Sequence, residues 1–360
     1  MTESALIKVG FALLSNSRAP IPSTRIAALN MLPLLRADGF DPHIVFEPAV
    51  GTQTPDVAAL LPALLAARFD AIVFQKVHGA SVEALAHGLR AAGIKTVFAL
   101  CDVVDVAMAR ATDMTVIVTD YLKSLYPPSL QHKIRVVHDG IEKPDLCKRD
   151  WGSHRGSARV PLRAVLVTSA VLHRLPVLPT LPPWLQVTIV GRYAATPLAR
   201  LSAARWSFQR AHGRTEKLAV LRFLANRRIR CLPWHPQRVY DAMCAADIGI
   251  IPIEAAPPHL AGTPAPGWKV KSENRLTMKM AIGLPVIATP IPSYQPVVTQ
   301  GVDAYLAADA DAWLTCLEAL REPAARAAMG QAARAAALRR YSMQEQARLL
   351  AAALREVLGR

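Results

Sequence analysis

The chain has 360 residues, more than one compact core usually holds, so we expect two domains. Hydrophobic residues make up 52% and charged residues 19%, a balance that excludes a disordered chain. The sequence contains no apolar run of the roughly 20 residues that a bilayer span requires. The formal net charge of +15 favours anionic partners such as nucleic acid, membrane head groups or phosphorylated small molecules.

The N-terminus and the cysteines indicate where the protein works. Residues 1–18 show neither a basic start nor a small-residue cleavage site, so we interpret them as folded protein and not as a signal peptide. The five cysteines are scattered and form no C-x-x-C pair, which argues against a disulfide framework and a zinc site. This usage is typical of a reducing cytoplasm.

Short β-branched runs alternate with helical stretches in the first part of the chain. The expected strands cover 7–14, 43–46, 71–74, 96–100, 116–118 and 134–137, and the expected helices cover 23–35, 57–68 and 82–92. This alternation predicts βαβ units and a parallel sheet with helices on both faces. Such sheets bind ligands at the carboxyl ends of their strands.

A polar, glycine-bearing stretch at 139–163 predicts an interdomain linker. A second series follows, with strands at 164–168, 187–190, 229–232, 248–253 and 285–288, and helices at 198–204, 215–225, 239–245 and 272–282. We therefore predict an α/β fold of two doubly wound, Rossmann-like domains that face a cleft. The predicted boundaries are 1–145 for the N-terminal domain, 146–162 for the linker and 163–340 for the C-terminal domain.

Residues 341–360 have the pattern of an amphipathic helix. Ser342 is its predicted N-cap, and Glu345 stands three residues on, as in a capping box. We expect this helix to pack back on the N-terminal domain.

The excess of basic residues is concentrated in residues 194–232, which hold eight Arg and one Lys against one acidic residue, Glu216. This stretch is either a solvated helix face or a patch that faces a membrane or an acceptor. The basic charge favours a peripheral position at the inner face of a membrane. Nucleic acid is not expected as a partner, because only Trp206, Phe208 and Phe223 interleave with the basic residues.

Residues 269–289 contain the most informative helix of the sequence, with Ser272 as its predicted N-cap. Lys269, Lys271 and Arg275 crowd its first turn, although helix N-termini favour acidic residues. Cations beside free backbone N–H groups form a site for a phosphate or diphosphate. The alternative is that these side chains point into water.

Four motifs, in this order, resemble the nucleotide-binding half of the GT-B glycosyltransferases, particularly glycosyltransferase family 4. They are IRVVHDGIE at 134–142, VTIVGRY at 187–193, ADIGIIPI at 246–253 and A-x-G-x-P-V-x-A at 281–288. The resemblance covers residues 130–310, and the N-terminal half only by architecture. Many family members carry two glutamates where this chain has Val270 and Met278. Its K-S-E-N-R opening is similar to a divergent branch with K-S-x-N-[KR], in which Glu273 or Glu254 could replace the usual ribose contact.

The resemblance implies transfer of a sugar from a nucleoside diphosphate sugar to a glycan or lipid-linked acceptor, with retention of the anomeric configuration. Lys271 and Arg275 are the expected catalytic cations, which stabilise the departing diphosphate. Ser272 and Asn274 would supply polar contacts, and Lys269 belongs to the same cluster.

Neither a metal nor a cofactor is expected. The D-x-D sequence Asp309–Asp311 lies in an alanine-rich stretch and is interpreted as a helix start, where aspartates act as caps.

Further donor-side candidates follow the predicted strands of the second domain. Each has a plain alternative: a surface arginine, a core tryptophan or an ordinary loop residue. The candidates are Ser169, Gly191, Arg192, Trp234, His235 and Glu273.

Candidates on the acceptor side lie in the N-terminal domain. Ser23, Thr24 and Arg25 open a helix, and Lys76 follows a strand. Asp102 ends the next strand, and it is either a catalytic residue that contacts sugar hydroxyls or a helix N-cap. Cys101 precedes it where related enzymes have a histidine. His138 and Asp139 are interpreted as residues that shape the hinge.

Two functions of other classes remain open. One is a sugar-nucleotide epimerase or hydrolase of the same fold, which needs a cluster of carboxylate and histidine groups. The other is a catalytically silent homologue that binds a nucleotide, for which the missing glutamates argue.

Overall fold

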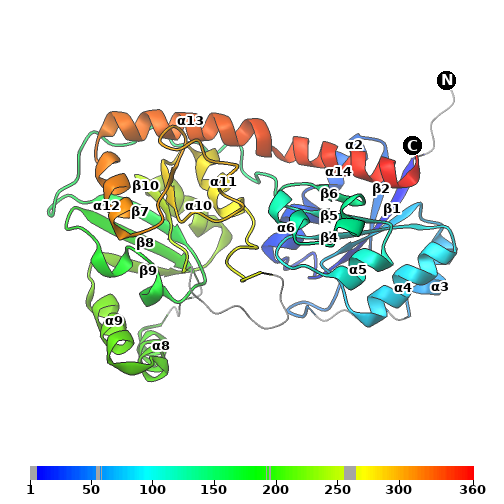
Figure 1. Cartoon of the computed structure of the whole chain (residues 1–360), viewed down its shortest axis with the longest axis horizontal. Helices are drawn as coiled ribbons and strands as arrows, with labels where there is room; N and C mark the ends of the chain where they lie inside the picture. Colours follow the sequence, from blue (N-terminus) through cyan, green and yellow to red (C-terminus); the bar gives the residue numbers. More distant parts are fainter. Residues whose placement is uncertain (1–5, 54–56, 58, 192, 194–195, 255–264) are drawn as a thin grey trace. The chain divides into compact units, whose positions relative to one another are not determined.

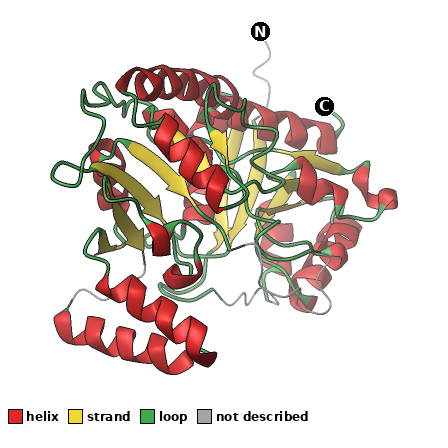
Figure 2. Ribbon diagram, turned by 60° about the vertical axis from the view of Figure 1, so that its left-hand side comes forward, coloured by secondary structure: helices red, strands yellow, loops and turns green. Residues whose placement is uncertain are grey.

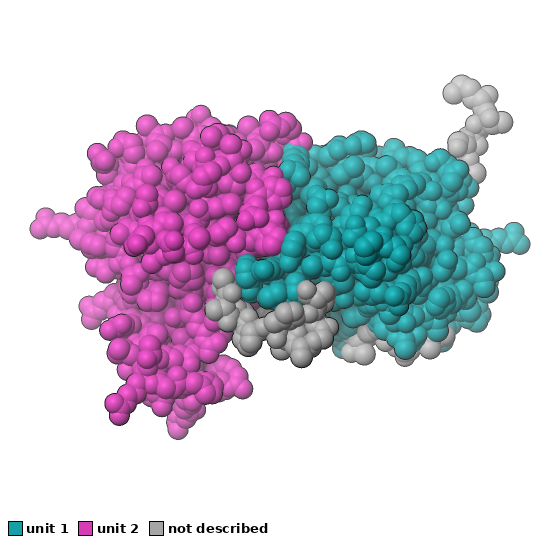
Figure 3. Space-filling model, viewed as in Figure 1, with its two compact units in different colours: residues 1–142, 259–274, 340–360 teal, residues 143–258, 275–339 magenta. Residues whose placement is uncertain are grey.

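The computed structural model describes the chain except for residues 1–5, 54–56, 58, 192, 194–195 and 255–264. Its contacts divide the chain into two compact units (Figure 3). The first unit contains residues 1–142, 259–274 and 340–360, and the second contains residues 143–258 and 275–339. The chain therefore passes between the units four times.

The first unit is built on a six-stranded parallel sheet with the order β2-β1-β3-β4-β5-β6 (Figure 1). The strands are β1 (Ile7–Leu13), β2 (Phe40–Phe46), β3 (Ala71–Gln75), β4 (Lys95–Leu100), β5 (Met114–Ile117) and β6 (Ile134–Val136). β3 is buried along its whole length, as expected for a parallel strand covered on both faces.

Helices cover both faces of this sheet and form one apolar core on each. They are α1 (Pro22–Thr24), η1 (Arg25–Leu29), α2 (Leu32–Ala37), α3 (Leu61–Ala67), α4 (Ala80–Ala91), α5 (Val106–Ala111), α6 (Asp120–Ser124), α7 (Pro128–Gln131) and α14 (Met343–Leu358). α14 packs beside α2 and buries Leu350 and Leu354 in the core that includes Leu35. The Ser342 hydroxyl accepts the Glu345 N–H at 3.2 Å, which confirms the predicted cap.

The second unit has its own six-stranded parallel sheet, in the order β12-β11-β10-β7-β8-β9. Its strands are β7 (Leu162–Val167), β8 (Leu185–Gly191), β9 (Ile229–Pro233), β10 (Ile248–Ile251), β11 (Val286–Ala288) and β12 (Tyr305–Leu306). Its helical elements are η2 (Leu172–Arg174), η3 (Leu178–Thr180), α8 (Pro197–Arg210), α9 (Gly213–Ala225), α10 (Pro236–Ala245), α11 (Asn274–Ile282), α12 (Ala310–Ala319) and α13 (Pro323–Tyr341). Figure 2 shows the two sheets with helices around them.

The structure confirms the prediction of two doubly wound α/β domains. Asp309 caps α12 as predicted, with its Oδ1 accepting the Ala312 N–H at 2.9 Å. β12 and α13 were not predicted. Among the described helices, none has the length and the apolar composition required to cross a membrane.

The segment expected to be a linker is fastened to the second unit. Arg326 of α13 is fully buried, and its guanidinium donates hydrogen bonds to the carbonyl oxygens of Trp151, Gly152 and His154 at 2.8–3.0 Å. The Trp151 indole N–H in turn donates to the Gly283 carbonyl at 2.7 Å. These bonds satisfy polar groups of an irregular segment that has few other backbone partners.

We expect Arg326→Leu to lower the free energy of unfolding by about 3 kcal/mol or more, because it leaves several buried carbonyl groups without donors. Arg339→Leu, at an exposed position of the same helix, is the matched control and should change stability by less than about 0.5 kcal/mol. Urea unfolding of both variants measures the difference. Equal stability of the two variants would contradict the assigned role of Arg326.

Candidate active site

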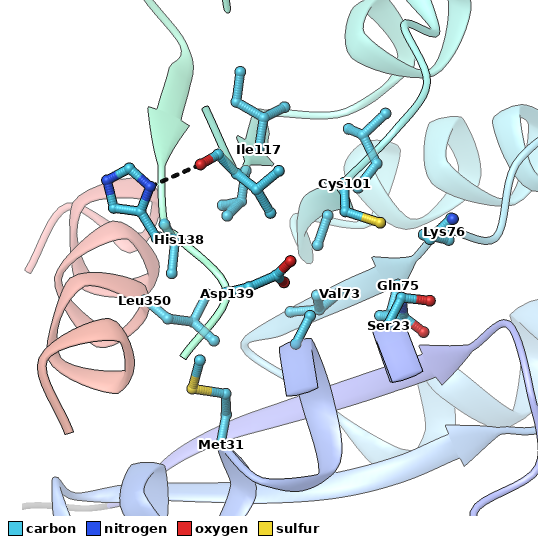
Figure 4. Close-up of a pocket in the computed structure, with 16 residues that line it drawn as sticks. Ser23, Met31, Val73, Gln75, Lys76, Cys101, Ile117, His138, Asp139 and Leu350 are labelled. Atoms are coloured by element: carbon cyan, nitrogen blue, oxygen red, sulfur yellow. Dashed lines mark hydrogen bonds between the residues drawn. The ribbon is translucent and has the colours of Figure 1, made fainter. Parts of the chain in front are cut away.

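The carboxyl ends of β3 to β6 meet at one edge of the first sheet and line a cavity (Figure 4). Gln75 and Lys76 come from the end of β3, Cys101 follows β4, and His138 and Asp139 follow β6. Parallel strands bring such residues together at the edge where this fold class binds ligands. The apolar floor is formed by Val73, Ala99, Val116, Val137 and, from the helices, Met31 and Leu350.

Lys76 and Asp102 form an ion pair at this edge, with 2.6 Å between Nζ and Oδ1. Burial opposes the charge on Lys76, but the neighbouring Cys101 and Asp102 hold its pKa above the ordinary value. The backbone of Lys76 is left-handed, with φ at 57°, and its N–H donates to the Ala99 carbonyl at 2.8 Å. Such a conformation is costly for a non-glycine residue, and costly conformations are common at functional sites.

The alternative interpretation of Asp102 as a helix N-cap is wrong. α5 begins at Val106, and Asp105 is its N-cap, with Oδ1 accepting the Met108 N–H at 2.9 Å. Asp102 is therefore available to pair with Lys76. The structure brings together two residues that the sequence presented 26 positions apart.

Asp139 lies against the cavity and is almost completely buried. Burial and, to a smaller extent, the nearby Glu273 raise its pKa, a hydrogen bond with Ser272 lowers it, and the net result is a pKa of about 7. In Figure 4 the carboxyl group points toward Cys101, whereas the His138 ring points the other way. A carboxyl group with a pKa near neutrality can give or take a proton. Asp139 thus lines this cavity, and its role in shaping the hinge stays a prediction.

The imidazole of His138 is fixed by its neighbours. Its Nδ1 lies 2.8 Å from the Val118 carbonyl oxygen and 2.7 Å from Oε1 of the buried Glu273. Because a carbonyl oxygen accepts hydrogen bonds, Nδ1 carries the proton and donates to both groups. The ring also makes an edge contact with Tyr341, with 5.0 Å between centroids.

The predicted acceptor-side residues at 23–25 have different environments. Ser23 lines the cavity. Thr24 is fully buried, and its hydroxyl lies between Ser15 and Gln75 at 2.9 Å from each. Arg25 donates to both carboxylate oxygens of Glu142 at 2.5 and 2.8 Å. The anion that Arg25 binds in the structure is therefore a side chain of the same chain.

The predicted cations stand at the start of α11. Lys271 is exposed, and its Nζ has no hydrogen-bond or ion-pair partner among the described residues. Lys269 is half-buried with Nζ 5.3 Å from the Trp268 ring centre, and Arg275 is half-buried. α11 begins at Asn274, so the prediction of Ser272 as N-cap is wrong by one residue. The Ser272 side chain bonds to Asp139 instead.

Lys279, which the sequence analysis did not single out, is fully buried one turn further along α11. Its Nζ donates to the Arg275 carbonyl at 3.2 Å. Burial and the neighbouring Arg275 lower its pKa to about 7.

In the second unit, further donor-side candidates gather at the carboxyl ends of β7, β8 and β9. Ser169 is exposed beyond β7, and Gly191 ends β8 beside it. A Cβ on Gly191 would lie 2.1 Å from the Thr168 carbonyl oxygen, so a side chain does not fit there. Trp234 is 44% exposed, and its backbone N–H donates to the Gly191 carbonyl at 2.7 Å. His235 is exposed at the start of α10.

The predicted residues fall into these two units. Arg192 lies outside the described residues. Lys269, Lys271, Ser272, Glu273 and Asn274 belong to the first unit, whereas Arg275, Ser169, Gly191, Trp234 and His235 belong to the second. Within the described residues, no group of three or more His, Cys, Asp or Glu side chains is arranged to hold a metal ion.

Comparison with solved structures defines the class of protein. HepE of Anabaena, in complex with UDP and glucose, has a TM-score of 0.66 at 14% identity, with 97% of this chain and 100% of that chain covered. A glycosyltransferase of Rickettsia africae has 0.66 at 13%, with 98% of each chain covered. Sucrose-phosphate synthase of Thermosynechococcus elongatus has 0.61 at 12%, with 98% and 99% covered. The fold is that of the two-domain GT-B glycosyltransferases.

Comparison with family models then gives the family. Residues 173–352, half of the chain, match the family described as glycosyl transferase-like. The chain belongs to this family, and it is a glycosyltransferase. A comparison with curated protein sequences finds no match.

We expect the free energy of unfolding to fall as the pH rises from about 4 to about 7, because folded Asp139 keeps a proton that the unfolded chain has released. Asp139→Asn removes this dependence. The difference in free energy of unfolding between the variant and the wild type should therefore shift in favour of the variant, by on the order of a few kcal/mol, when the pH is raised from 5 to 8. Urea unfolding at both pH values measures this gain. Asp145→Asn, at an exposed position, is the control, and a gain as large in the control would contradict the prediction.

Proposed function

We propose that this glycosyltransferase moves a sugar from a nucleoside diphosphate sugar to a glycan or lipid-linked acceptor, with retention of configuration and without a metal ion. It would then be a divergent member of glycosyltransferase family 4. The observation that carries the proposal is the group of three cations, Lys269, Lys271 and Arg275, around the start of α11. None of the three has a carboxylate partner among the described residues.

The chemistry of the leaving group explains why such cations are needed. Negative charge develops on the departing diphosphate, and cations already in place stabilise it without reorganisation. Lys271 is the accessible cation and lies just before α11, Arg275 is the second residue of that helix, and the buried Lys279, whose Nζ donates to the Arg275 carbonyl, adds charge when it is protonated. Phosphate groups accept charge-assisted hydrogen bonds from both Lys and Arg.

The second unit offers a surface for the base and the sugar. Trp234 exposes nearly half of its area beside Gly191, and an exposed indole is suited to stacking on a base. HepE, which shares the fold, has been crystallised with UDP-glucose. We therefore propose a uridine diphosphate sugar as the first donor to test.

The cavity of the first unit is proposed to bind the acceptor. The Lys76–Asp102 pair and the carboxyl group of Asp139 present polar groups that can bind sugar hydroxyls, and the apolar floor suits the face of a sugar ring. The net charge of +15 favours an acceptor held at an anionic membrane.

Turnover is the direct test of the leaving-group site. With a panel of nucleotide sugars and a membrane-lipid extract as acceptor, we expect release of nucleoside diphosphate. Lys271→Ala with Arg275→Ala should reduce this release by about 100-fold or more while the melting temperature stays unchanged. Lys143→Ala with Arg339→Ala, at two exposed positions, is the matched control.

Three results would contradict the proposal in different ways. A normal rate in the double variant would show that the leaving group is stabilised elsewhere. Interconversion of the donor without transfer would favour the epimerase. Tight UDP binding with no release from any donor would favour the catalytically silent homologue.

Removal of divalent metal should leave turnover unchanged, because the proposed cations are side chains of the chain itself. The measurement is diphosphate release before and after EDTA and gel filtration. A loss that Mg²⁺ or Mn²⁺ restores would contradict metal independence but would leave the donor assignment intact.

A further inference from the structure

We propose that helices α8 and α9 form a docking surface for an anionic lipid membrane. Residues 197–225, called the α8–α9 hairpin below, form two contacting helices joined by two residues. Figures 1 and 2 both show them side by side and apart from the strands of the second unit. The inference concerns a surface outside the proposed donor and acceptor sites.

The hairpin exposes large apolar side chains on both helices. None of the described side chains of α8 is buried. The exposed residues and their exposed fractions are Leu198 (78%), Leu201 (68%), Trp206 (56%), Leu218 (45%), Leu221 (50%) and Leu224 (50%). Single exposed leucines are ordinary, but six large exposed apolar side chains on one pair of contacting helices are typical of a surface for a protein or a membrane.

The hairpin is also rich in exposed positive charge. Its described and exposed basic residues are Arg205, Arg210, Arg214, Lys217 and Arg222. Glu216, the one acidic residue of residues 194–232, is half-buried and already bonded. Its carboxylate accepts hydrogen bonds from Arg174 Nε at 2.7 Å and from the His212 backbone N–H at 2.6 Å. The outer face of α9 therefore presents cations without a compensating anion.

The spacing along α9 separates its two faces. Val220 is buried and Phe223 packs partly against the core of the second unit, so this side faces inward. Leu218 and Leu221 lie on the opposite side, three residues apart, with Lys217 and Arg222 beside them. An apolar stripe flanked by basic residues is the pattern of a helix that lies in a membrane interface.

Chemistry favours lipid over the other occupants. Leucine and tryptophan side chains can enter the acyl boundary while the long basic side chains remain among the phosphates. A second copy of this chain would bring like charges together, which opposes association. Nucleic acid would neutralise the cations but would leave the leucines exposed to water.

The test is co-sedimentation of the full chain with vesicles, without any sugar donor. We expect binding to an equal mixture of phosphatidylglycerol and phosphatidylcholine, weaker binding at high salt, and no binding to phosphatidylcholine alone. Arg214→Gln with Arg222→Gln should weaken partitioning about thirtyfold, and Leu218→Ser with Leu221→Ser at least about tenfold. Arg149→Gln with Arg159→Gln removes the same charge at exposed positions outside the hairpin and should change binding little.

Circular dichroism and the melting temperature establish that each variant is folded. Failure of the wild type to bind the mixed vesicles at low salt would overturn the inference. Hairpin variants that bind the vesicles like the control would also overturn it. So would a dimer, seen in sedimentation velocity, that the hairpin substitutions abolish. Nucleic-acid binding that depends on the hairpin residues in the absence of vesicles would overturn it as well. Diphosphate release with a water-soluble acceptor should persist in all of these variants, so a failure of this inference is separate from a failure of the proposed chemistry.

Discussion

The hydrogen bond between the buried Glu273 and the Nδ1–H of His138 is the interaction on which the candidate site most depends. A carboxylate removed from water costs several kcal/mol unless a donor meets it. Here the donor comes from the carboxyl end of the first sheet, and the adjacent Ser272 bonds to Asp139 at the same edge. The residues on either side of Glu273, including the exposed Lys271, are positioned by these two bonds.

Other residues occupy the two positions at which the resemblance to glycosyltransferase family 4 leads us to expect glutamates. Where many members are expected to hold a ribose with carboxylates, this chain has Val270, which is buried in the core of the first unit. Lys279, next to Met278, is buried against Gly249, where a Cβ would approach its side chain to 2.9 Å.

Local chemistry made much of the fold predictable. Short β-branched runs predicted eleven of the strands. Ser342 and Asp309 were identified as helix caps, because a cap bonds to a backbone group only three residues further along the chain. α13 was not predicted, because its alanine- and arginine-rich sequence has no apolar period. β12 has two residues, too few for a pattern.

The site was less accessible from the sequence, because its pairings join distant residues. Arg25 and Glu142 are separated by 117 positions, and a single sequence does not record such a contact. Strand ends identified Lys76 and Asp102 as candidates, but their pairing and the near-neutral pKa of Asp139 depend on burial, which only packing defines.

Gly191 has one further consequence. Because a methyl group there would collide with the backbone of Thr168, this strand end must present bare peptide to whatever approaches it. Any other residue at position 191 would force the end of β8 or the Thr168 carbonyl group to move.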